Sequence, residues 1–559
     1  MSTVRRALRF LEVSNPGGKD ATYLTNDDLL PCPPEQRKWK AINFVTFWLA
    51  DSINLSTFMI ASSMVGAGMT WWQAWLAVWV GYAISIVFLV LNARAGAQYH
   101  LIFPAYARAS WGIFGAIWPT LNRVVCAMLW YGVQAWIGGE SVYVLICAIW
   151  PSFARVPNGI PSSGTDTAHF VSFFIFSFIS LFAIYFPLHS IRHLFTLKAV
   201  VSPAAAIALC VWCCVRAGGA GELFHQPATI HGSSLEWAFV ANLMNCIANM
   251  ATLIVNSVDF ASRASKPSDV VMPQLVAMPL SFGITSLIGI LIASATPSLF
   301  GEFVWSPLEV MSRLLLADGA GSHGTRAACA FISIGFIIAQ LGTNIAANSI
   351  SAGCDSTALL PRFMSIRRGG YLAALIGFCI CPWNLASGSN KFGDYLSAYS
   401  VFLSSIAGVL ITHHYAVAKQ RIKVADLYTL DKSGLYRYTY GINFRAFAAY
   451  LAGLLMNVVG FAGAVGNTVP LAATRIYQLS FFTGFGVSSL VYYLLCLAFP
   501  IPVPTDDELL EEPPVPPPVH YGDHLTDGGK AGSFVGEGAE EKKSDEAGDV
   551  RVHHAGEVV

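Results

Sequence analysis

Charged residues are scarce in this chain. Of its 559 residues, 12% are Asp, Glu, Lys or Arg and 55% are hydrophobic, and the mean hydropathy is +0.55. Soluble domains carry about 25% charged residues, so the composition excludes a soluble globular protein. The alternating ten-residue segments that a membrane β-barrel needs are missing as well. The sequence therefore predicts an all-α integral membrane protein.

Motifs of soluble catalysis are also missing. The chain has no phosphate-binding glycine loop, no dinucleotide-binding unit, no HExxH zinc motif and no nucleophilic serine elbow. Most of the twelve cysteines lie inside apolar runs, and no pair in an outward loop suggests a disulfide. We expect no enzyme activity, no cofactor, no metal site and no nucleic-acid partner.

Apolar runs long enough to cross a bilayer, about 20 residues each, recur along the chain. Their ends are uncertain by a few residues. Twelve spans are predicted, with cores at 43–68, 73–95, 114–146, 169–188, 194–215, 237–258, 271–295, 327–350, 371–387, 394–416, 445–465 and 479–499.

Basic residues concentrate on one side of these spans. Such an excess marks the cytoplasmic side of a membrane protein, so we expect both termini in the cytoplasm and the apolar spans in contact with lipid. Besides the N-terminal segment, this side is assigned Arg94, Arg108, Arg192, Lys198, Arg263, Lys266, Arg362, Arg367, Arg368, Lys419, Arg421 and Lys423.

Three regions differ in composition. Residues 1–42 form a charged cytoplasmic tail, residues 43–500 the membrane body, and residues 501–559 a tail rich in Pro, Glu, Gly and Asp that we expect to be disordered. Lys542 and Lys543 are candidates for ubiquitylation by trafficking machinery, although a solvated charge run is the simpler interpretation.

The first and sixth spans contain polar residues at mid-bilayer depth, where they are costly unless they face a cavity or one another. The clusters lie five helices apart and predict a five-plus-five inverted repeat in which helices one and six are broken. Polar contacts for helix packing are the alternative. The residues are Asp51, Ser52, Asn54, Ser56 and Thr57 in the first span and Asn242, Asn245, Asn249, Thr252 and Asn256 in the sixth.

Trp130 and Gln134 lie four residues apart in the third apolar run. On a helix this spacing places both side chains on one face. An indole can stack on a flat heterocycle, and a carboxamide can pair with the N–H and C=O groups of its edge. A lipid-facing tryptophan beside a glutamine bonded to a neighbouring helix is the alternative. The pair predicts a binding site for a small planar heterocyclic substrate.

The eighth span adds a second polar face. Asn344 and Asn348 are four residues apart, with Thr343 and Gln340 nearby, which is typical of a cavity wall. Asp355 follows at the cytoplasmic end, where it could form a gate with an arginine such as Arg362, Arg367 or Arg368.

The tenth span contains an aromatic stripe, Phe392, Tyr395 and Tyr399, typical of core packing or of a lid over a stacked ring. Three carboxylates lie within or at the ends of membrane helices and are candidates for proton coupling. They are Asp51, Asp259, which has Arg263 one turn away as an alternative partner, and Asp355.

At this point the chain resembles a known family. The resemblance covers about residues 20–500 and is carried by long segments such as WLADSINLSTFMIAS, MLWYGVQAWIGG, ANMATLIVNSVDFASRA and LGTNIAANSISAGCDSTALLPRF. They are similar to the first nucleobase–cation symporter family, in particular its fungal uracil/allantoin permease (Fur-type) branch. The resemblance implies a LeuT-type fold of about twelve helices with alternating access, in which helices one, three, six, eight and ten line a central site.

The resemblance also implies roles for single residues. The stacking tryptophan and the helix-three glutamine fall on Trp130 and Gln134, the helix-eight asparagine on Asn348, and the helix-one contacts on Asn54 and Ser56. The second stacking aromatic of the bacterial hydantoin member falls near Met250, beside Asn249, where this chain has no aromatic; a thioether can still cover a ring face. Outer-gate aromatics fall on Phe392 and Tyr395.

The implied cation site departs from that of sodium-coupled relatives. Their backbone ligands match Ala50, Ile53 and Ala339, and their two adjacent hydroxyls match Gly342 and Thr343, of which only Thr343 keeps an oxygen. We therefore expect coupling to H+ rather than to Na+.

These observations lead to one expected function and several rivals. We expect a secondary active transporter that takes up a nucleobase, uracil first, across the plasma membrane by proton symport with alternating access. Allantoin, uridine, uric acid and thiamine are alternative substrates, and a nutrient receptor or sensor that binds without transport is the alternative class. A channel is not expected, because no ring of charges or filter loop is present.

Overall fold

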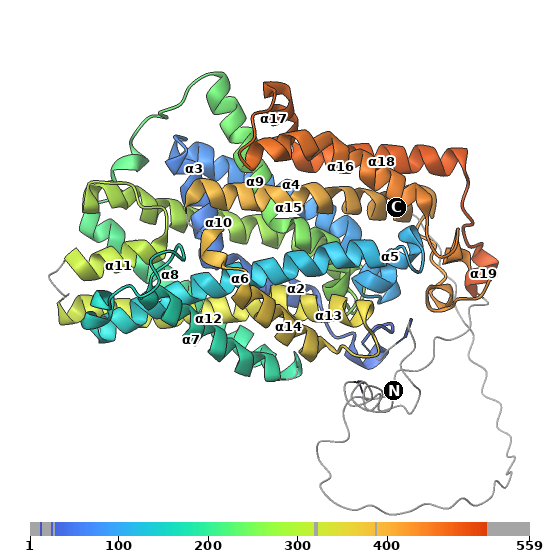
Figure 1. The fold of residues 1–559 in the computed structure, drawn as a ribbon, viewed down its shortest axis with the longest axis horizontal. Helices are drawn as coiled ribbons and strands as arrows, with labels where there is room; N and C mark the ends of the chain where they lie inside the picture. The colour runs from blue at the N-terminus through green and yellow to red at the C-terminus, as the bar shows by residue number, and fades with distance from the viewer. Residues whose placement is uncertain are drawn as a thin grey trace, which may run out of the picture. The chain divides into compact units, whose positions relative to one another are not determined.

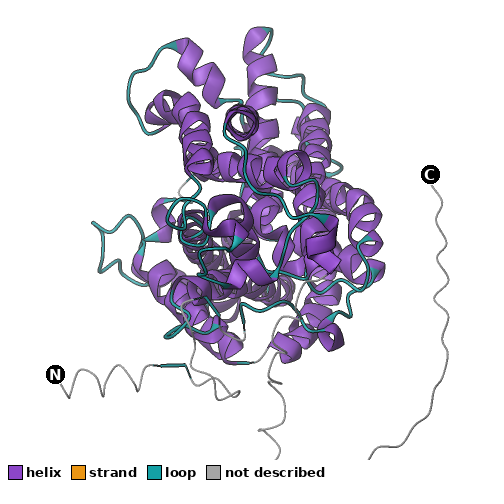
Figure 2. Ribbon diagram, turned by 90° about the vertical axis from the view of Figure 1, so that its right-hand side faces the viewer, coloured by secondary structure: helices purple, strands orange, loops and turns teal. Residues whose placement is uncertain are grey.

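The computed structural model describes residues 12–13, 24–25, 28–186, 188–317, 322–385 and 388–510, without the side chains of 188–193, 317, 389–392, 394–397 and 510. Within this part of the chain the regular elements are all helical (Figure 2). Extended pairing there is limited to two isolated bridges, Trp39 with Ala264 and Thr439 with Ile442. The predicted all-α class is confirmed.

The main helices follow one another with short connections. In chain order they are α2 (Ala41–Ser52), α3 (Leu55–Gly66), α4 (Trp71–Tyr99), α5 (Phe103–Trp111), α6 (Ile117–Ile149), α7 (Thr167–Tyr185), α8 (Leu188–Ala217), α9 (Ser233–Ala261), α10 (Ser268–Phe300), α11 (Pro307–Ala317), α12 (His323–Thr343), α13 (Ile350–Leu359), α14 (Ile366–Cys379), α15 (Ser389–Thr412), α16 (Phe444–Ala464), α17 (Leu471–Tyr477), α18 (Ser480–Ala498) and α19 (Asp506–Leu510).

Ten helical spans in the described residues are long and apolar enough to cross a membrane, and the bent pair α2–α3 brings the count to eleven. The remaining predicted span, 371–387, corresponds to α14. Its 14 residues reach about 21 Å, short of the roughly 30 Å of a hydrocarbon core. The short turn Pro382–Asn384 follows it. The protein is thus a multi-pass membrane protein, with one predicted span shorter than expected.

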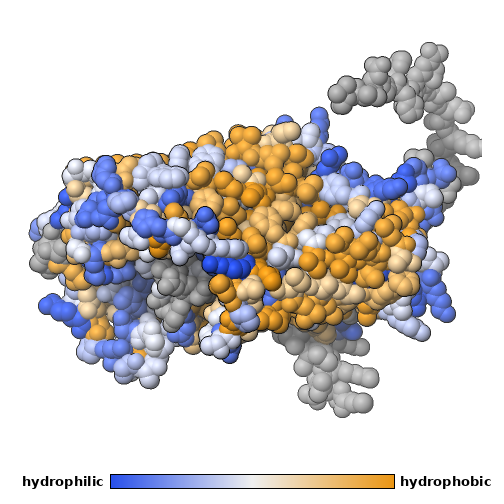
Figure 3. Space-filling model, turned by 90° about the horizontal axis from the view of Figure 1, so that it is seen from above, coloured by the Kyte–Doolittle hydropathy of each residue, from blue (hydrophilic) through white to orange (hydrophobic). Residues whose placement is uncertain are grey.

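The surface matches this assignment. On the face seen in Figure 3, apolar residues form a broad band with polar residues toward both ends. Large apolar side chains such as Val215, Phe331 and Leu455 are largely exposed on the helices. In water such a surface would be unfavourable, whereas in a bilayer it contacts lipid.

The first membrane helix is broken, as predicted. α2 and α3 meet at an angle of 57°, and Ile53 and Asn54 between them are not helical. Asn54 is the N-cap of α3: its Oδ1 accepts from Thr57 N at 3.0 Å, and its Nδ2 donates to Asp51 O at 2.6 Å. One carboxamide therefore satisfies backbone groups on both sides of the break.

The sixth membrane helix is not broken, and that prediction is wrong. α9 runs continuously from Ser233 to Ala261 and contains no glycine or proline. Two of its asparagines, Asn249 and Asn256, bond residues of other helices. Asn249 Nδ2 donates to Tyr82 Oη of α4 at 3.1 Å, and the Asn256 carboxamide bonds Ser351 of α13 at 3.0 Å.

The long helices lie side by side and pack in two groups (Figure 1). In the first group, α4 packs against α9 and α10, and α10 also packs against α2 and α3. In the second, α6 packs against α7, α12, α13 and α14. α15 contacts α9 as well as α16 and α18. The broken helix reaches α6 through Ser56 of α3, whose hydroxyl donates to Gln134 Oε1.

The eighth membrane helix contains a π-helical segment, Asn344–Ser349, between α12 and α13. A π-helical turn widens the backbone spacing and often occurs at functional sites. Here the segment contains both asparagines of the predicted polar wall.

The predicted tails lie mostly outside the described residues. Of 501–559 only 501–510 are described, ending in α19, and Lys542 and Lys543 fall outside. Leu24 of the N-terminal segment is held by Arg108 of α5. Arg108 is buried and donates to Leu24 O and Leu427 O at 3.1 and 3.0 Å. Arg108 thus holds chain segments together and is not the loop residue expected from the charge pattern.

Candidate functional site

Trp130 and Gln134 are both buried on one face of α6. The Trp130 ring meets Tyr399 of α15 edge-on, with centroids 6.0 Å apart and planes at 78°. Tyr399 Oη donates to Ala248 O of α9 at 2.7 Å. Trp130 of α6, the third membrane helix, therefore contacts α15, the tenth, which is bonded in turn to α9, the sixth.

The amide of Gln134 connects three helices. Its Oε1 accepts from Gln340 Nε2 of α12 at 2.6 Å and from Ser56 Oγ of α3 at 3.3 Å. Gln340 Nε2 also lies 3.4 Å from the backbone oxygen of Gln134. Ser56 is thus close to Gln134 because α3 begins directly after the break in helix one.

The two asparagines of the π-helical segment form a second connection to α6. Asn344 Nδ2 donates to Tyr131 O at 3.1 Å, and Asn348 Nδ2 donates to Asn344 Oδ1 at 2.9 Å. All three residues are buried. Asn348 is thereby held on the α6 side of the helix, as expected for a residue of the polar wall.

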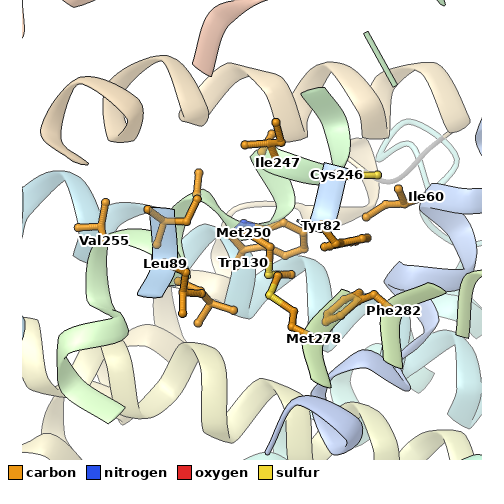
Figure 4. Close-up of a cluster of buried hydrophobic side chains, with 14 of the residues drawn as sticks. Ile60, Tyr82, Leu89, Trp130, Cys246, Ile247, Met250, Val255, Met278 and Phe282 are labelled. Carbon is orange, nitrogen blue, oxygen red and sulfur yellow. The ribbon is translucent and has the colours of Figure 1, made fainter. Parts of the chain in front are cut away.

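The other predicted substrate-binding residues have structural partners. Asn54 caps α3, as described above, so both ends of its carboxamide bond the backbone. Asn249 donates to Tyr82 Oη. Met250 belongs to the same buried apolar cluster as Trp130 and Tyr82 (Figure 4). Met250 is thus a packing residue in this structure, and Asn54 and Asn249 hold the backbone and the helices together.

The predicted gate is described only in part. The side chains of Phe392 and Tyr395 lie outside the described residues, although both belong to α15. Tyr399, the third aromatic, is the one whose contact with Trp130 is described. Because the Tyr399 ring contacts Trp130, a movement of α15 would change the packing of the Trp130 indole.

Asp355 has a different partner from the arginines considered in the sequence. Its Oδ2 lies 2.5 Å from Arg123 Nη2 of α6, and Asp259 Oδ2 of α9 lies 3.9 Å from the same nitrogen. Arg123 Nη2 also donates to Ser351 O at 2.8 Å. Asp259 Oδ1 accepts from Phe103 N at 2.6 Å. A buried charge cluster thus joins helices three, six and eight.

This cluster corrects the expected pairings of Asp355 with Arg362, Arg367 or Arg368 and of Asp259 with Arg263. Helical spacing favours a partner one turn away, but packing places Arg123 nearer to both carboxylates. Arg362 instead pairs with Glu12. The signal for Arg123 was present in the sequence, because an arginine inside a predicted span requires a buried anionic partner.

Lys198 occupies the region of the expected cation site. It is 3% exposed on α8, and its Nζ donates to Thr343 Oγ1 at 2.6 Å. Its assignment to a cytoplasmic loop is therefore wrong: the apolar run that begins at Leu194 already surrounds it.

Gly342 lies directly against the lysine. A Cβ at this position would be 2.9 Å from Lys198 Cδ. The glycine that replaces a hydroxyl residue in the expected sodium site thus provides space for the lysine stem. Thr343 and Ala339 are buried beside it on α12, and Ala50 and Ile53 lie at the end of α2.

Comparison with known proteins supports one family. The sequence profile of permeases for cytosine/purines, uracil, thiamine and allantoin matches residues 31–484. The chain is 44% identical to an allantoin permease of Saccharomyces cerevisiae over 489 residues, covering 86% of this chain and 77% of that protein. It is 42% identical to a uracil permease of the same organism over 492 residues, with the same coverage.

The fold is also similar to a solved transporter. Mhp1, a nucleobase-cation-symport-1 family transporter in a closed conformation with bromovinylhydantoin bound, matches with a TM-score of 0.69 at 22% identity, covering 87% of this chain and 98% of that one. This likeness confirms the LeuT-type arrangement predicted from the sequence. The chain belongs to the family of permeases for cytosine/purines, uracil, thiamine and allantoin.

Proposed function

We propose that this protein is a proton symporter that takes up a planar nucleobase-like ring, uracil first, across the plasma membrane. Both termini face the cytoplasm, and the protein carries out transport without catalysis. The observation that carries the proposal is that Trp130 and Gln134 are buried on one face of α6, while the buried Asn348 is linked to the same helix through Asn344. An indole face and two amides along one helix can stack a ring and bond its polar edge.

Lys198 supports H+ as the coupling ion. Two unit charges about 4 Å apart repel by roughly 4 kcal/mol at an effective dielectric constant near 20. An ammonium bonded to Thr343 would therefore oppose Na+ at the neighbouring ligands. An amine can instead gain and lose a proton, and Asp51, buried near the end of α2, is the favoured carboxylate because no ion pair with Arg123 is described for it. Asp259 and Asp355 are engaged with Arg123.

Allantoin is the second candidate substrate. The identity to the allantoin permease, 44%, is slightly above the 42% to the uracil permease. Both rings carry a carbonyl beside an N–H group, so both fit a site built from two amides. A receptor that binds without transport would lack counterflow, which separates this class from a transporter.

The test is uptake of radiolabelled uracil by yeast that lacks its own transporters and expresses this chain. We expect saturable uptake that a protonophore abolishes, that Na+ does not stimulate, and that Gln134→Ala reduces strongly at normal surface expression. Lys198→Ala should retain counterflow but lose accumulation against a gradient, whereas Lys266→Ala, at an exposed lysine, should behave as wild type. Sodium-driven uptake indifferent to a proton gradient would refute the proposed coupling.

A further inference from the structure

Two side chains outside the predicted contact set determine how Gln134 and Asn348 face a substrate. An amide can present either its oxygen or its NH2 group, and the two ends are opposite in hydrogen bonding. A backbone carbonyl oxygen, in contrast, only accepts. An amide that bonds a carbonyl is therefore fixed in orientation, and it can fix the next amide in turn.

The first such chain runs through Gln340. Its Nε2 lies 3.4 Å from the carbonyl oxygen of Gln134, so the group on this side must be the NH2. The same nitrogen donates to Gln134 Oε1 at 2.6 Å, and Ser56 Oγ donates to that oxygen as well. With its oxygen held by two donors, Gln134 keeps its own NH2 group for another acceptor.

The second chain runs through Asn344. Its Nδ2 donates to Tyr131 O at 3.1 Å, which turns its Oδ1 toward Asn348. Asn348 Nδ2 donates to that oxygen at 2.9 Å. The remaining oxygen of Asn348 is then the acceptor left for another group. Both chains begin at carbonyls of α6 one helical turn apart, so one rigid helix sets both orientations.

We propose that Gln340 and Asn344 are positioning residues that fix the polarity of the site: a donor from Gln134 and an acceptor from Asn348. The ring class that fits is one with a C=O beside an N–H, such as an imide, lactam or ureide. Uracil has this edge. We place the C4=O and N3–H edge of uracil at these amides, because at the same edge cytosine presents an amino group and a bare ring nitrogen, with donor and acceptor reversed. This inference rests on the proposed function and specifies its substrate class.

The test is competition of unlabelled uracil and cytosine against radiolabelled uracil, with the full-length protein in the same yeast. Wild type should prefer uracil by at least about tenfold, because reversed polarity leaves buried groups unpaired. In Gln340→Glu the carboxylate only accepts, so the Gln134 amide turns over and presents its oxygen. The ratio of uracil to cytosine affinities should then shift toward cytosine by about tenfold or more.

Gln340→Met frees the Gln134 amide without adding charge, and the ratio should fall only in part, because Asn348 still discriminates between the two rings. The matched control is Gln274→Glu, because Gln274 is a buried glutamine that accepts from Trp48 Nε1, away from the site. It should leave the ratio unchanged. A general loss of folding lowers uptake of both rings alike and does not move the ratio.

The outcomes separate the two proposals. An unchanged ratio in Gln340→Met, or in Gln340→Glu where that variant reaches the surface, overturns the positioning role while uracil uptake by wild type stands. Absence of saturable uracil and allantoin uptake in wild type overturns the proposed function and this inference with it. A ratio that falls to about one in Gln340→Glu and only in part in Gln340→Met supports the inference, because Asn344 still holds Asn348 with its oxygen toward the ring.

Discussion

The first and sixth membrane helices carry similar polar residues at similar depth, yet one is broken and the other is continuous. In helix one, Asn54 turns its carboxamide back onto the backbone of Asp51 and Thr57. In helix six, Asn249 and Asn256 bond residues of α4 and α13. Polar content alone therefore does not break a membrane helix.

The difference lies in where each side chain finds its partner. A break exposes backbone groups that must be satisfied inside the membrane, and a short asparagine at an N-cap position can do this locally. Glycine and proline do not explain the difference, because α9 contains neither and the break between α2 and α3 contains neither. In α9, Asn249 and Asn256 bond other helices, and no asparagine caps a break in the backbone. Helix one is therefore bent at Asn54. Helix six is continuous through the same depth and is joined to helices three and eight by the ion pairs of Arg123 with Asp259 and Asp355.

The largest expected effect comes from cutting the charge cluster that anchors α9. Asp355→Ala removes the carboxylate 2.5 Å from Arg123 and should cost about 3 kcal/mol of unfolding free energy, because a buried charge loses its main partner. Asp259, at 3.9 Å, compensates only in part. Unfolding of purified protein by a denaturing detergent measures the loss.

The matched control for that experiment is an exposed pair. Asp506 is 72% exposed and pairs with Arg421 at 2.7 Å, so Asp506→Ala should cost less than about 1 kcal/mol. Equal losses in both variants would mean that the buried cluster does not hold the helices together.

A smaller effect distinguishes the two asparagine roles. Asn54→Ala removes a cap and should cost about 1–2 kcal/mol, together with most uptake, because Ser56 then loses its position beside Gln134. Asn54→Asp keeps the capping oxygen and should recover stability in part. Asn249→Ala removes one bond to Tyr82 and should cost about 1 kcal/mol with α9 intact. Thermal unfolding and uptake are measured on all three; a stable, active Asn54→Ala protein would refute the capping role.

The hydrophobic pattern and the residue spacing predicted features that lie within a single helix. Apolar runs located ten spans and the bent first helix, and a four-residue spacing placed Trp130 and Gln134 on one face. Partner choice across helices was not predictable in this way. Nothing near Asp355 in the sequence points to Arg123, and nothing near Thr343 points to Lys198. Both basic residues lie inside apolar runs, which signals burial but not the partner.

The smallest expected effect concerns the contact between α15, which is membrane helix ten, and α9. Tyr399→Phe removes the hydroxyl that donates to Ala248 O but keeps the ring edge on Trp130. The cost should be about 0.5–1.5 kcal/mol, with KM for uptake raised a few-fold because the indole is less well held. Tyr438→Phe is the control: Tyr438 Oη donates to Ala109 O at 2.6 Å, away from the site. A similar stability loss without a change in KM is expected there. If Tyr399→Phe leaves KM unchanged, as the control should, the bond between helix ten and Ala248 of helix six does not position Trp130 for the substrate.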